Sequence, residues 1–388
     1  MSTLKVDGIR SNSATSDAIT LASDGTCTAN ITNKPNRNKI INGAMQVSQR
    51  GTTFSPSGTN QIYTLDRFEH VTTANANGDC TVTQASDAPT GFKNSYKVTP
   101  DSTNTPTAGG NVTIRYQAEG QDTQDLNYGT SSAKSLTISF YAKTATENSG
   151  DQYSLVLFYA RNDGTTKTVL KSFTPTSTWQ RFSFTIAGDT DSTYGIRNSA
   201  DTGITITWVL ASGPDDVRSA INTWTVDGGY FRAVTGQDNF MDNTNNEFYL
   251  TGVQLEVSDH ATDFEHRSFG QELTLCHRYC VVSHRYDTSD GYSGVALHYS
   301  GYQVSGGNWI WCSASFPTEM RTTPSLDTSD GDGNTGNKHT IWTSTGGSVT
   351  HNRDNYHTSV FRDHFTISNY WDTKYGMRIG GYKADAEL

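Results

Sequence analysis

The feature that most constrains this chain is a two-residue alternation of apolar and polar side chains in many short segments. In SLTISFYA, Leu136, Ile138 and Phe140 alternate with hydroxyl-bearing residues. Successive side chains of a β-strand point to opposite faces of a sheet, so this alternation predicts strands that bury one face. The same pattern occurs in NVTIRY, YSLVLFYA, WQRFSFTIAG, GITITWVL and FYLTGVQLEV.

The segments between these strands have the composition of turns. NDGTT at residues 162–166 is an example, and the chain contains 35 Gly among its 388 residues. Gly, Asn and Asp favour turns, whereas β-branched and aromatic residues favour strands. Strands that follow one another without long intervening helices predict an all-β chain, an antiparallel jelly-roll sandwich.

The pattern changes twice along the chain and so indicates a domain organisation. RSFGQELTLCHRYC spaces Leu273, Cys276 and Cys280 by three and four, which predicts a short helix with Ser268 as its cap and Glu272 in its first turn. A second, smaller β-rich region follows it. We expect an extended N-terminal arm at 1–40 that docks on a virion, a jelly-roll domain at 41–265, a connecting helix at 266–281 and a C-terminal β-domain at 282–388, the receptor-binding tip.

The charge of the chain excludes some partners. The net charge is −10 and no basic run occurs, which disfavours binding to nucleic acid or to an anionic membrane. No stretch approaches the roughly 20 apolar residues of a transmembrane helix, and the first thirty residues lack the apolar core of a signal peptide. We therefore expect synthesis in a host cytoplasm and no membrane insertion.

Several segments together resemble bacteriophage tail-fibre and related virion proteins. IINGAMQVSQRGTTF with YTLDRF resembles the opening of a domain common in these proteins, and FYLTGVQLEVSDHATDFEHRSFGQELTLCHRYC resembles its closing. SASFPTEMRTTPSL at 313–326 and MSTLKVDGI at the start are also similar to segments of such fibres. The resemblance implies a jelly roll of carbohydrate-binding-module type, a homotrimer and a place on the virion. It brings no set of catalytic residues with it.

The opening segment, residues 41–51, is predicted to have a structural role. Asn42 and Gly43 form a turn, and Met45 and Val47 pack inward at strand spacing. Arg50, together with Asp66 and Arg67, is expected to lock the segment to the sandwich through charge-assisted bonds.

Three clusters of polar residues have both a chemical and a structural interpretation. Cys276, His277, Cys280 and His284 include zinc donors, but buried thiols are the preferred interpretation. Asp330, Asp332 and Asn334 occupy alternate positions of a calcium-like loop, although Thr335 and Ile341 replace the expected Gly and Glu, so we predict a solvent loop and no metal. The segment DFEHR at 263–267 could supply acid and base groups, yet an ion-pair network at a domain junction is preferred.

The last region is rich in aromatic residues, which suit stacking on sugar rings. Tyr302, Trp342 and Tyr370 are the candidate glycan-binding residues. Trp309 and Trp311 share a strand face, and we expect them in a domain or trimer core rather than at the surface.

These observations favour a trimeric, non-catalytic tail fibre or spike that attaches to a host surface polysaccharide. Its other partners would be virion tail or capsid proteins, bound through the N-terminal arm. A head fibre or capsid decoration protein built from the same modules is one alternative, and a virion polysaccharide depolymerase is another. No nucleotide, cofactor or hydrolase motif occurs in the sequence, and no cofactor is expected.

Overall fold

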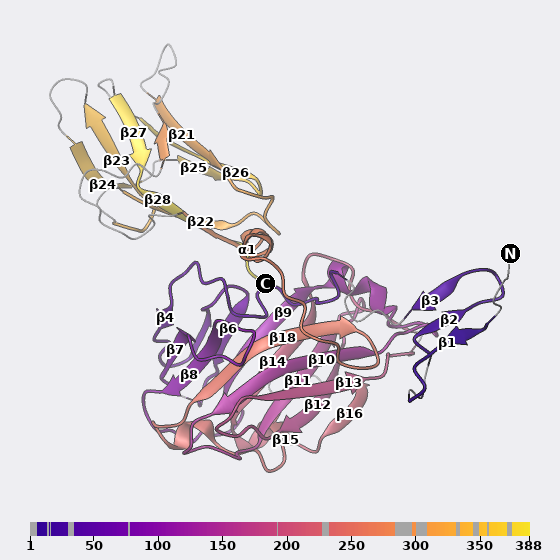
Figure 1. Ribbon diagram of the computed structural model, residues 1–388. Helices are drawn as coiled ribbons and strands as arrows, with labels where there is room; N and C mark the ends of the chain where they lie inside the picture. Colours follow the sequence, from indigo (N-terminus) through magenta and orange to yellow (C-terminus); the bar gives the residue numbers. More distant parts are fainter. Residues whose placement is uncertain are drawn as a thin grey trace.

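Antiparallel β-sheets make up most of the regular secondary structure of the computed structural model, which confirms the predicted all-β class (Figure 1). It describes the chain except for residues 1–5, 14, 16, 30–34, 77, 192, 227–232, 284–296, 300–308, 331–333, 344–348, 355–356 and 371–374.

Two large sheets form a sandwich. Within the described residues, the six-stranded sheet has the order β13 (Gln180–Ile186), β10 (Leu136–Thr144), β18 (Phe248–Val257), β8 (Ser95–Pro100), β7 (Cys80–Ala85), β4 (Thr53–Phe54). The seven-stranded sheet has the order β16 (Ile221–Val226), β12 (Thr166–Phe173), β11 (Tyr153–Ala160), β14 (Thr202–Ser212), β9 (Asn111–Glu119), β6 (Phe68–Thr72), β5 (Asn60–Tyr63). The chain crosses repeatedly from one sheet to the other, as in a jelly roll.

Aromatic side chains fill the centre of the sandwich. Trp208 of β14 is fully buried and meets Phe140 of β10 edge-on, with ring centroids 5.6 Å apart. Each such side chain contributes about 1.5–3 kcal/mol by leaving water. The inward residues predicted from the alternation are buried: Val112, Ile114, Tyr116, Leu136, Ile138, Phe140, Tyr153, Leu155, Leu157, Tyr159, Ile186, Ile204, Ile206 and Trp208, with Phe182 and Phe184 partly buried against them.

Short elements cover the ends and outer faces of the sandwich. A small apolar cluster lies between the outer face of the seven-stranded sheet and the parallel pair β15 (Val217–Arg218) and β17 (Ala233–Val234). Three 3₁₀ turns complete the described part of this domain: η1 (Gly120–Leu126), η2 (Pro214–Asp216) and η3 (Phe240–Asp242).

The expected N-terminal arm contains a small sheet of its own, formed by β1 (Gly8–Ile9), β2 (Ile19–Leu21) and β3 (Cys27–Ala29). It lies to one side of the sandwich in Figure 1. None of the described side chains in residues 6–27 is buried. This agrees with the prediction that the segment builds no hydrophobic core of its own.

The opening segment packs as predicted but is not a strand. Met45 and Val47 are 0% and 2% exposed, while residues 41–51 form turns and irregular backbone. Asn42 and Met45 have left-handed φ angles of 61° and 55°, which a strand does not contain. The expected strand spacing is therefore wrong, because turn chemistry at Asn42 overrides the short alternation that follows it.

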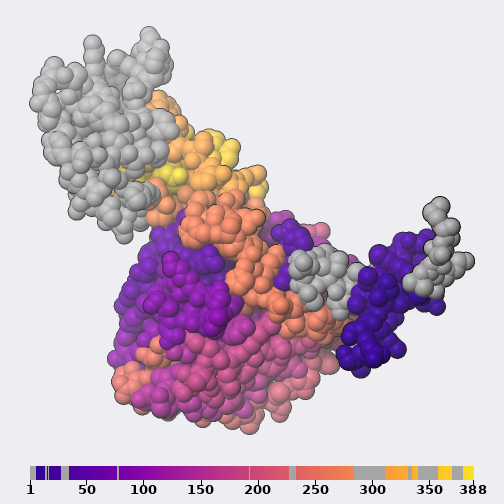
Figure 2. All heavy atoms as spheres, viewed as in Figure 1, coloured from indigo at the N-terminus to yellow at the C-terminus, as the bar shows by residue number. Residues whose placement is uncertain are grey.

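The helix α1 (Phe269–His277) follows β18 and begins as predicted at Ser268. The Ser268 hydroxyl accepts a hydrogen bond from the Gln271 backbone N–H, and the Gln271 side chain accepts one from the Ser268 N–H, which completes a capping box. Glu272 lies in the first turn. Figure 2 shows this segment in orange, between the sandwich and the C-terminal strands.

The C-terminal strands form three further small sheets around a second hydrophobic core that includes Cys312, Phe316, Met320, Phe365 and Ile367. The sheets are β19 (Cys280–Val282), β28 (Gly381–Asp385), β22 (Ser325–Ser329); β20 (Leu297–Tyr299), β27 (Tyr375–Ile379), β23 (Lys338–Thr343), β24 (Val349–Asp354); and β21 (Trp309–Ser315), β26 (His364–Tyr370), β25 (His357–Val360).

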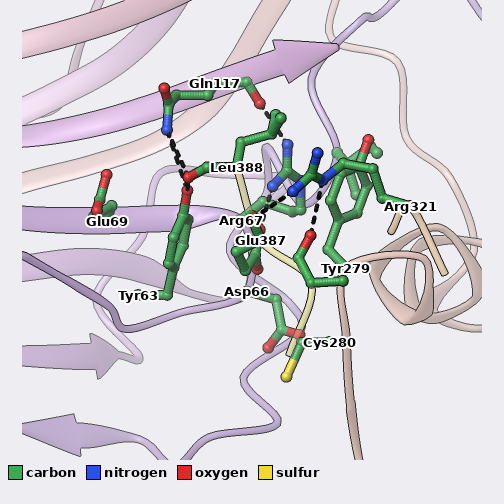
Figure 3. A network of polar contacts seen from close by, with 12 residues as sticks. Tyr63, Asp66, Arg67, Glu69, Gln117, Tyr279, Cys280, Arg321, Glu387 and Leu388 are labelled. Atoms are coloured by element: carbon green, nitrogen blue, oxygen red, sulfur yellow. Dashed lines mark hydrogen bonds and ion pairs between the residues drawn. The ribbon is translucent and has the colours of Figure 1, made fainter. Parts of the chain in front are cut away.

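A buried polar network joins these strands to the sandwich (Figure 3). Arg67 is fully buried, forms an ion pair with Glu387 and donates a hydrogen bond to the Gln117 carbonyl. Its guanidinium carbon lies 3.5 Å from the ring centroid of Tyr279. A buried cation requires such partners, so residues 385–388 are held against the sandwich by the charge they neutralise.

Two further arginines attach the same segment. Arg50 Nη2 lies 2.9 Å from Asp385 Oδ2 and 3.2 Å from Glu387 Oε1. Arg321 donates to the carbonyls of Glu387 and Ala200, at 2.8 Å and 3.0 Å. Arg50 was predicted to hold the opening segment on the sandwich, but it pairs with the C-terminal segment instead. Asp66 accepts hydrogen bonds from Gln49.

The end of α1 provides a third connection. Arg278 donates two hydrogen bonds to the Glu119 carboxylate, at 2.7 Å and 2.8 Å, and the Tyr279 hydroxyl donates a third at 2.6 Å. Burial raises the pKa of Glu119, but these bonds outweigh burial and leave the pKa below its usual value. The joint is therefore closely hydrogen-bonded, and it sets the orientation of the C-terminal strands on the sandwich.

Candidate functional site

The candidate site is the outer face of the sheet formed by β21, β26 and β25. Along β21 the side chains alternate: Cys312 and Ala314 are buried, while Ser313 and Ser315 are exposed. Trp311 falls on the exposed side and is 47% exposed. A large aromatic ring is thus presented to solvent by a regular strand whose opposite face packs on the C-terminal core.

Strand pairing places polar groups in a row with this ring. Trp311 pairs with Ser368 of β26, which in turn pairs with His357 of β25. In the next row of the same face, Thr366 lies between Ser313 and Ser359. Side chains directly opposite one another on paired strands lie about 5 Å apart, so the ring is bordered by hydroxyls and an imidazole.

Most of these residues, together with Thr358, line a recess with a volume of about 360 Å³. Ser368 is 1% exposed, and its hydroxyl has no hydrogen-bond partner among the described residues. Buried hydroxyls in folded proteins are normally paired, so this one can accept a partner from outside the chain. The lining residues are Trp311, His357, Thr358, Ser359, Thr366 and Ser368.

A second aromatic ring marks the other end of the same sheet. Phe361, 49% exposed, stacks on His364 with ring centroids 4.6 Å apart and an interplanar angle of 16°. His364 contacts Asp363 at 2.7 Å, and this hydrogen bond lowers the pKa of Asp363. His364 and Ser368 are four positions apart on β26, which corresponds to about 13 Å along a strand. The face can therefore contact an extended, hydroxyl-rich molecule at both ends.

The thiol beneath this face does not supply a nucleophile. Cys312 is 1% exposed, and burial raises its pKa to about 12. Because a thiolate and not a thiol is nucleophilic, Cys312 serves in packing.

Two of the three residues predicted to contact glycan belong to strands of this region. Tyr302 lies outside the described residues. Trp342 and Tyr370 belong to β23 and β26, but their side chains lie outside the described part of the structure. On the backbone, Tyr370 pairs with Trp309 and stands two residues beyond Ser368.

Trp311 does not belong to the domain core, since its side chain is exposed in the single chain, and its expected place in a trimer core stays a prediction. The side chain of Trp309 lies outside the described residues. The two-residue alternation along β21 is the signal that places Trp311 at the surface, because Trp311 shares its face with serines and not with Ala314 or Phe316.

In the described part of the calcium-like loop, Asp330 forms hydrogen bonds within the loop itself. The Asp330 carboxylate accepts hydrogen bonds from the backbone and side-chain nitrogens of Asn334, at 3.0 Å and 2.9 Å. Asp332 lies outside the described residues. Among the residues that the structure describes, no group of three or more His, Cys, Asp or Glu is arranged to hold a metal ion.

Of the two remaining polar clusters, one contains buried cysteines and the other forms ion pairs and hydrogen bonds. Cys276 and Cys280 are fully buried, and burial raises the pKa of both thiols, which opposes the thiolate form that zinc binds. His284 lies outside the described residues. In the segment 263–267, Arg267 pairs with Glu272 at 3.1 Å and Glu265 accepts a hydrogen bond from the Asn38 N–H, so this elbow ties residues before the sandwich to α1.

No family model matches the sequence, and no curated protein matches it. In the described part of the chain, no helix has the length and apolar character needed to cross a membrane.

Solved structures with some similarity are mainly sugar-binding modules. The family 11 carbohydrate-binding module of the cellulosomal cellulase Lic26A-Cel5E of Clostridium thermocellum is 14% identical, with a TM-score of 0.28 over 56% of this chain and 98% of the other. The CBM22-1 xylan-binding domain from Paenibacillus barcinonensis Xyn10C is 9% identical, with a TM-score of 0.28 over 58% and 96%.

A phage protein also occurs among these structures. The enzymatically active domain of bacteriophage CBA120 tailspike protein 4 is 11% identical, with a TM-score of 0.30 over 59% of this chain and 24% of the other. Similarity at this level establishes neither a ligand nor an activity.

Proposed function

We propose that this chain is a fibre or spike subunit of a bacteriophage virion, which forms a homotrimer and attaches without catalysis to a host surface polysaccharide. The observation that carries the proposal is the exposed ring of Trp311 beside the unpartnered hydroxyl of Ser368 in a recess of about 360 Å³. A flat aromatic face stacks on a sugar ring at low entropic cost, and hydroxyls and an imidazole bond its substituents.

The placement of this face supports attachment. It belongs to the C-terminal strands, which the buried joint around Arg67 holds on the sandwich, while β1 to β3 lie apart from it (Figure 1). In a trimer, three such faces linked at short range convert weak sugar contacts into strong attachment. The segments that resemble phage fibre proteins support the virion setting.

The test is binding of the full chain to purified bacterial capsular polysaccharides and lipopolysaccharide O-chains. Trp311→Ala is expected to weaken binding about 30-fold, corresponding to about 2 kcal/mol for the loss of a central aromatic contact. Phe269→Ala is the matched control, because Phe269 is 55% exposed on α1 and lies outside the recess. Equal affinity of the two variants would overturn the assignment of this face.

Two further measurements test the remaining parts of the proposal. Sedimentation equilibrium of the full chain should give three times the chain mass, and a monomer would contradict the trimeric fibre. If the chain releases reducing ends from a polysaccharide that it binds, it acts as a depolymerase, and the proposal of attachment without catalysis is wrong.

A further inference from the structure

A second recess lies on the sandwich, outside the region where glycan contacts were expected. It has a volume of about 460 Å³ and opens at the end of β10, beside the turn that leads into β13. Its volume is within the usual range for small-molecule sites. Its lining residues are Thr99, Lys143, Thr144, Ala145, Thr146, Glu147, Ser177, Thr244, Asn245 and Glu247.

Aromatic rings stand beside the recess. Tyr249 of β18 pairs with Lys143 on one side and Lys97 on the other, so the three form one row across the sheet. The Lys143 ammonium lies 4.5 Å from the Tyr249 ring centroid, and Trp179 meets Tyr249 edge-on at 6.0 Å. Trp179 remains partly exposed, and its indole N–H donates to Asp87 at 3.0 Å. Tyr249 is 7% exposed, and neither ring is among the residues that line the recess, so these contacts serve to hold Lys143 in place at its edge.

Charged groups of both signs face the recess in defined positions. Lys97 pairs with Glu247 at 2.6 Å, and the Tyr249 hydroxyl donates to the same carboxylate at 2.7 Å. Burial raises the pKa of Glu247, but these hydrogen bonds outweigh it and keep the pKa below its usual value. Glu247 is thus an ionised acceptor, and Lys143 is a donor already oriented by its ion pair with Asp87.

Two groups in the recess have no partner among the described residues. Thr144 is 2% exposed, and its hydroxyl is buried without a hydrogen bond. Glu147 is exposed, and no ion pair or hydrogen bond engages its carboxylate within the described part of the chain. A buried unpaired hydroxyl normally costs stability, so its presence in the wall of a recess points to a partner supplied by a ligand.

We propose that this recess is a second saccharide site and that it takes an uncharged sugar. A sugar offers many hydrogen-bond donors and acceptors, which match the hydroxyls, amide, ammonium and carboxylates of the lining. Acidic sugars are disfavoured, because the lining contains one lysine, which is already paired, and two glutamates. The site is independent of the Trp311 face, and a chain with both would bind a surface glycan at two points.

The experiment uses the full chain with cellotetraose, maltotetraose and N-acetylchitotetraose as uncharged probes and tetragalacturonate as the acidic one. Saturation-transfer NMR should detect an uncharged probe, and titration should show about fivefold weaker binding in Thr144→Val, the loss of one hydrogen bond. Adding Glu147→Gln should extend the loss to at least tenfold. Thr113→Val is the matched control, because Thr113 is also buried with an unpartnered hydroxyl but belongs to the other sheet.

The outcomes separate this site from the proposed attachment face. Binding that survives Trp311→Ala and Thr113→Val but falls in the Thr144 and Glu147 variants supports the second site. It is overturned if no uncharged probe binds, if tetragalacturonate binds more tightly, or if Trp311→Ala alone abolishes the signal.

Discussion

His70 is a titratable side chain inside the sandwich whose protonation the fold opposes. It is fully buried on β6, its Nε2 lies 3.3 Å from the Thr72 hydroxyl, and its Nδ1 has no partner among the described residues. Burial lowers its pKa from 6.5 to about 4. The imidazole is therefore neutral in the folded chain over the pH range in which an exposed histidine becomes charged.

This predicts a pH-dependent loss of stability at His70. Between pH 6.5 and 4 the unfolded chain binds a proton at this residue and the folded chain does not, so stability falls as the pH is lowered through this window. At 1.36 kcal/mol per pKa unit the loss approaches about 3 kcal/mol at pH 4. Chemical unfolding of the wild type and His70→Gln across this range should show a shallower pH dependence in the variant.

The matched control for this prediction is His266→Gln, which removes an exposed histidine outside the core. Its pH dependence should follow that of the wild type. Parallel curves for the wild type and His70→Gln would mean that the core accepts a charged imidazole.

The same residue scale shows what could be predicted of the site. Trp311 alternates in step with Ser313 and Ser315, and this local signal indicates an exposed position. The sequence interpretation gave more weight to the general tendency of tryptophan to be buried. Ser368 and His357 were not predictable as its neighbours. They come from strands about fifty residues further along the chain, and local alternation contains no information on which strands pair.

At the scale of elements, β18 contains a bulge that re-aims its side chains. Ser139 and Tyr141 of β10 pair with Gln254 and Thr251, so β18 places two residues opposite Phe140. Phe248 and Leu250 face the core before the bulge, and Val253 and Leu255 face it afterwards. Gly252 makes the change possible with a φ of 60°, which other residues rarely adopt.

Gly252→Ala is therefore expected to destabilise the sandwich by about 2–4 kcal/mol, the sum of a left-handed backbone cost and overpacking. A Cβ at this position would lie 2.8 Å from ring atoms of both Phe92 and Tyr141. Gly164→Ala isolates the backbone cost, since Gly164 has a φ of 86° and a Cβ there would contact nothing within 4 Å. Equal losses in urea unfolding of the two variants would refute the packing argument.

Elements were predictable where their signals are local. The alternation of β10, β11 and β14 and the cap at Ser268 lie within a few residues of the structures they specify, and each was predicted. The turn at Asn42 and Gly43 was predicted as well, but the irregular backbone that follows it was not, because Asn42 is held by contacts distant in sequence. Its side chain donates to the carbonyl of Asp66, and its backbone N–H donates to Glu272.

At the scale of the whole molecule, the joint between the sandwich and the C-terminal strands depends on a buried charge. Arg67 is neutralised by Glu387, and its ring contact with Tyr279 comes from the end of α1. Its φ of 69° lies in the left-handed region, a strained conformation for arginine that surrounding contacts must maintain. The sequence predicted that Arg50 and Arg67 form charge-assisted bonds. It did not predict Glu387 as the partner of Arg67, because Glu387 lies 320 residues away.

Removing the Arg67 side chain leaves Glu387 as a buried charge without its strongest partner. Arg67→Ala is expected to cost about 3–5 kcal/mol and to separate the unfolding of the C-terminal strands from that of the sandwich. Calorimetry should then show two transitions in the variant where the wild type shows coupled unfolding. Arg362→Ala, which breaks an exposed pair with Glu319, should cost less than about 1 kcal/mol.

Glu387→Gln extends this argument to function. It keeps the shape of the side chain but leaves Arg67 without an opposing full charge, so it should also weaken the coupling between the two parts. If the chain forms a trimer and binds a host glycan at the Trp311 face, the variant should keep the affinity of one chain for a short oligosaccharide. It should lose part of its avidity for the polymer, since the three faces of such a trimer would engage less efficiently on loosened joints. Unchanged attachment with uncoupled unfolding would show that the joint serves stability alone.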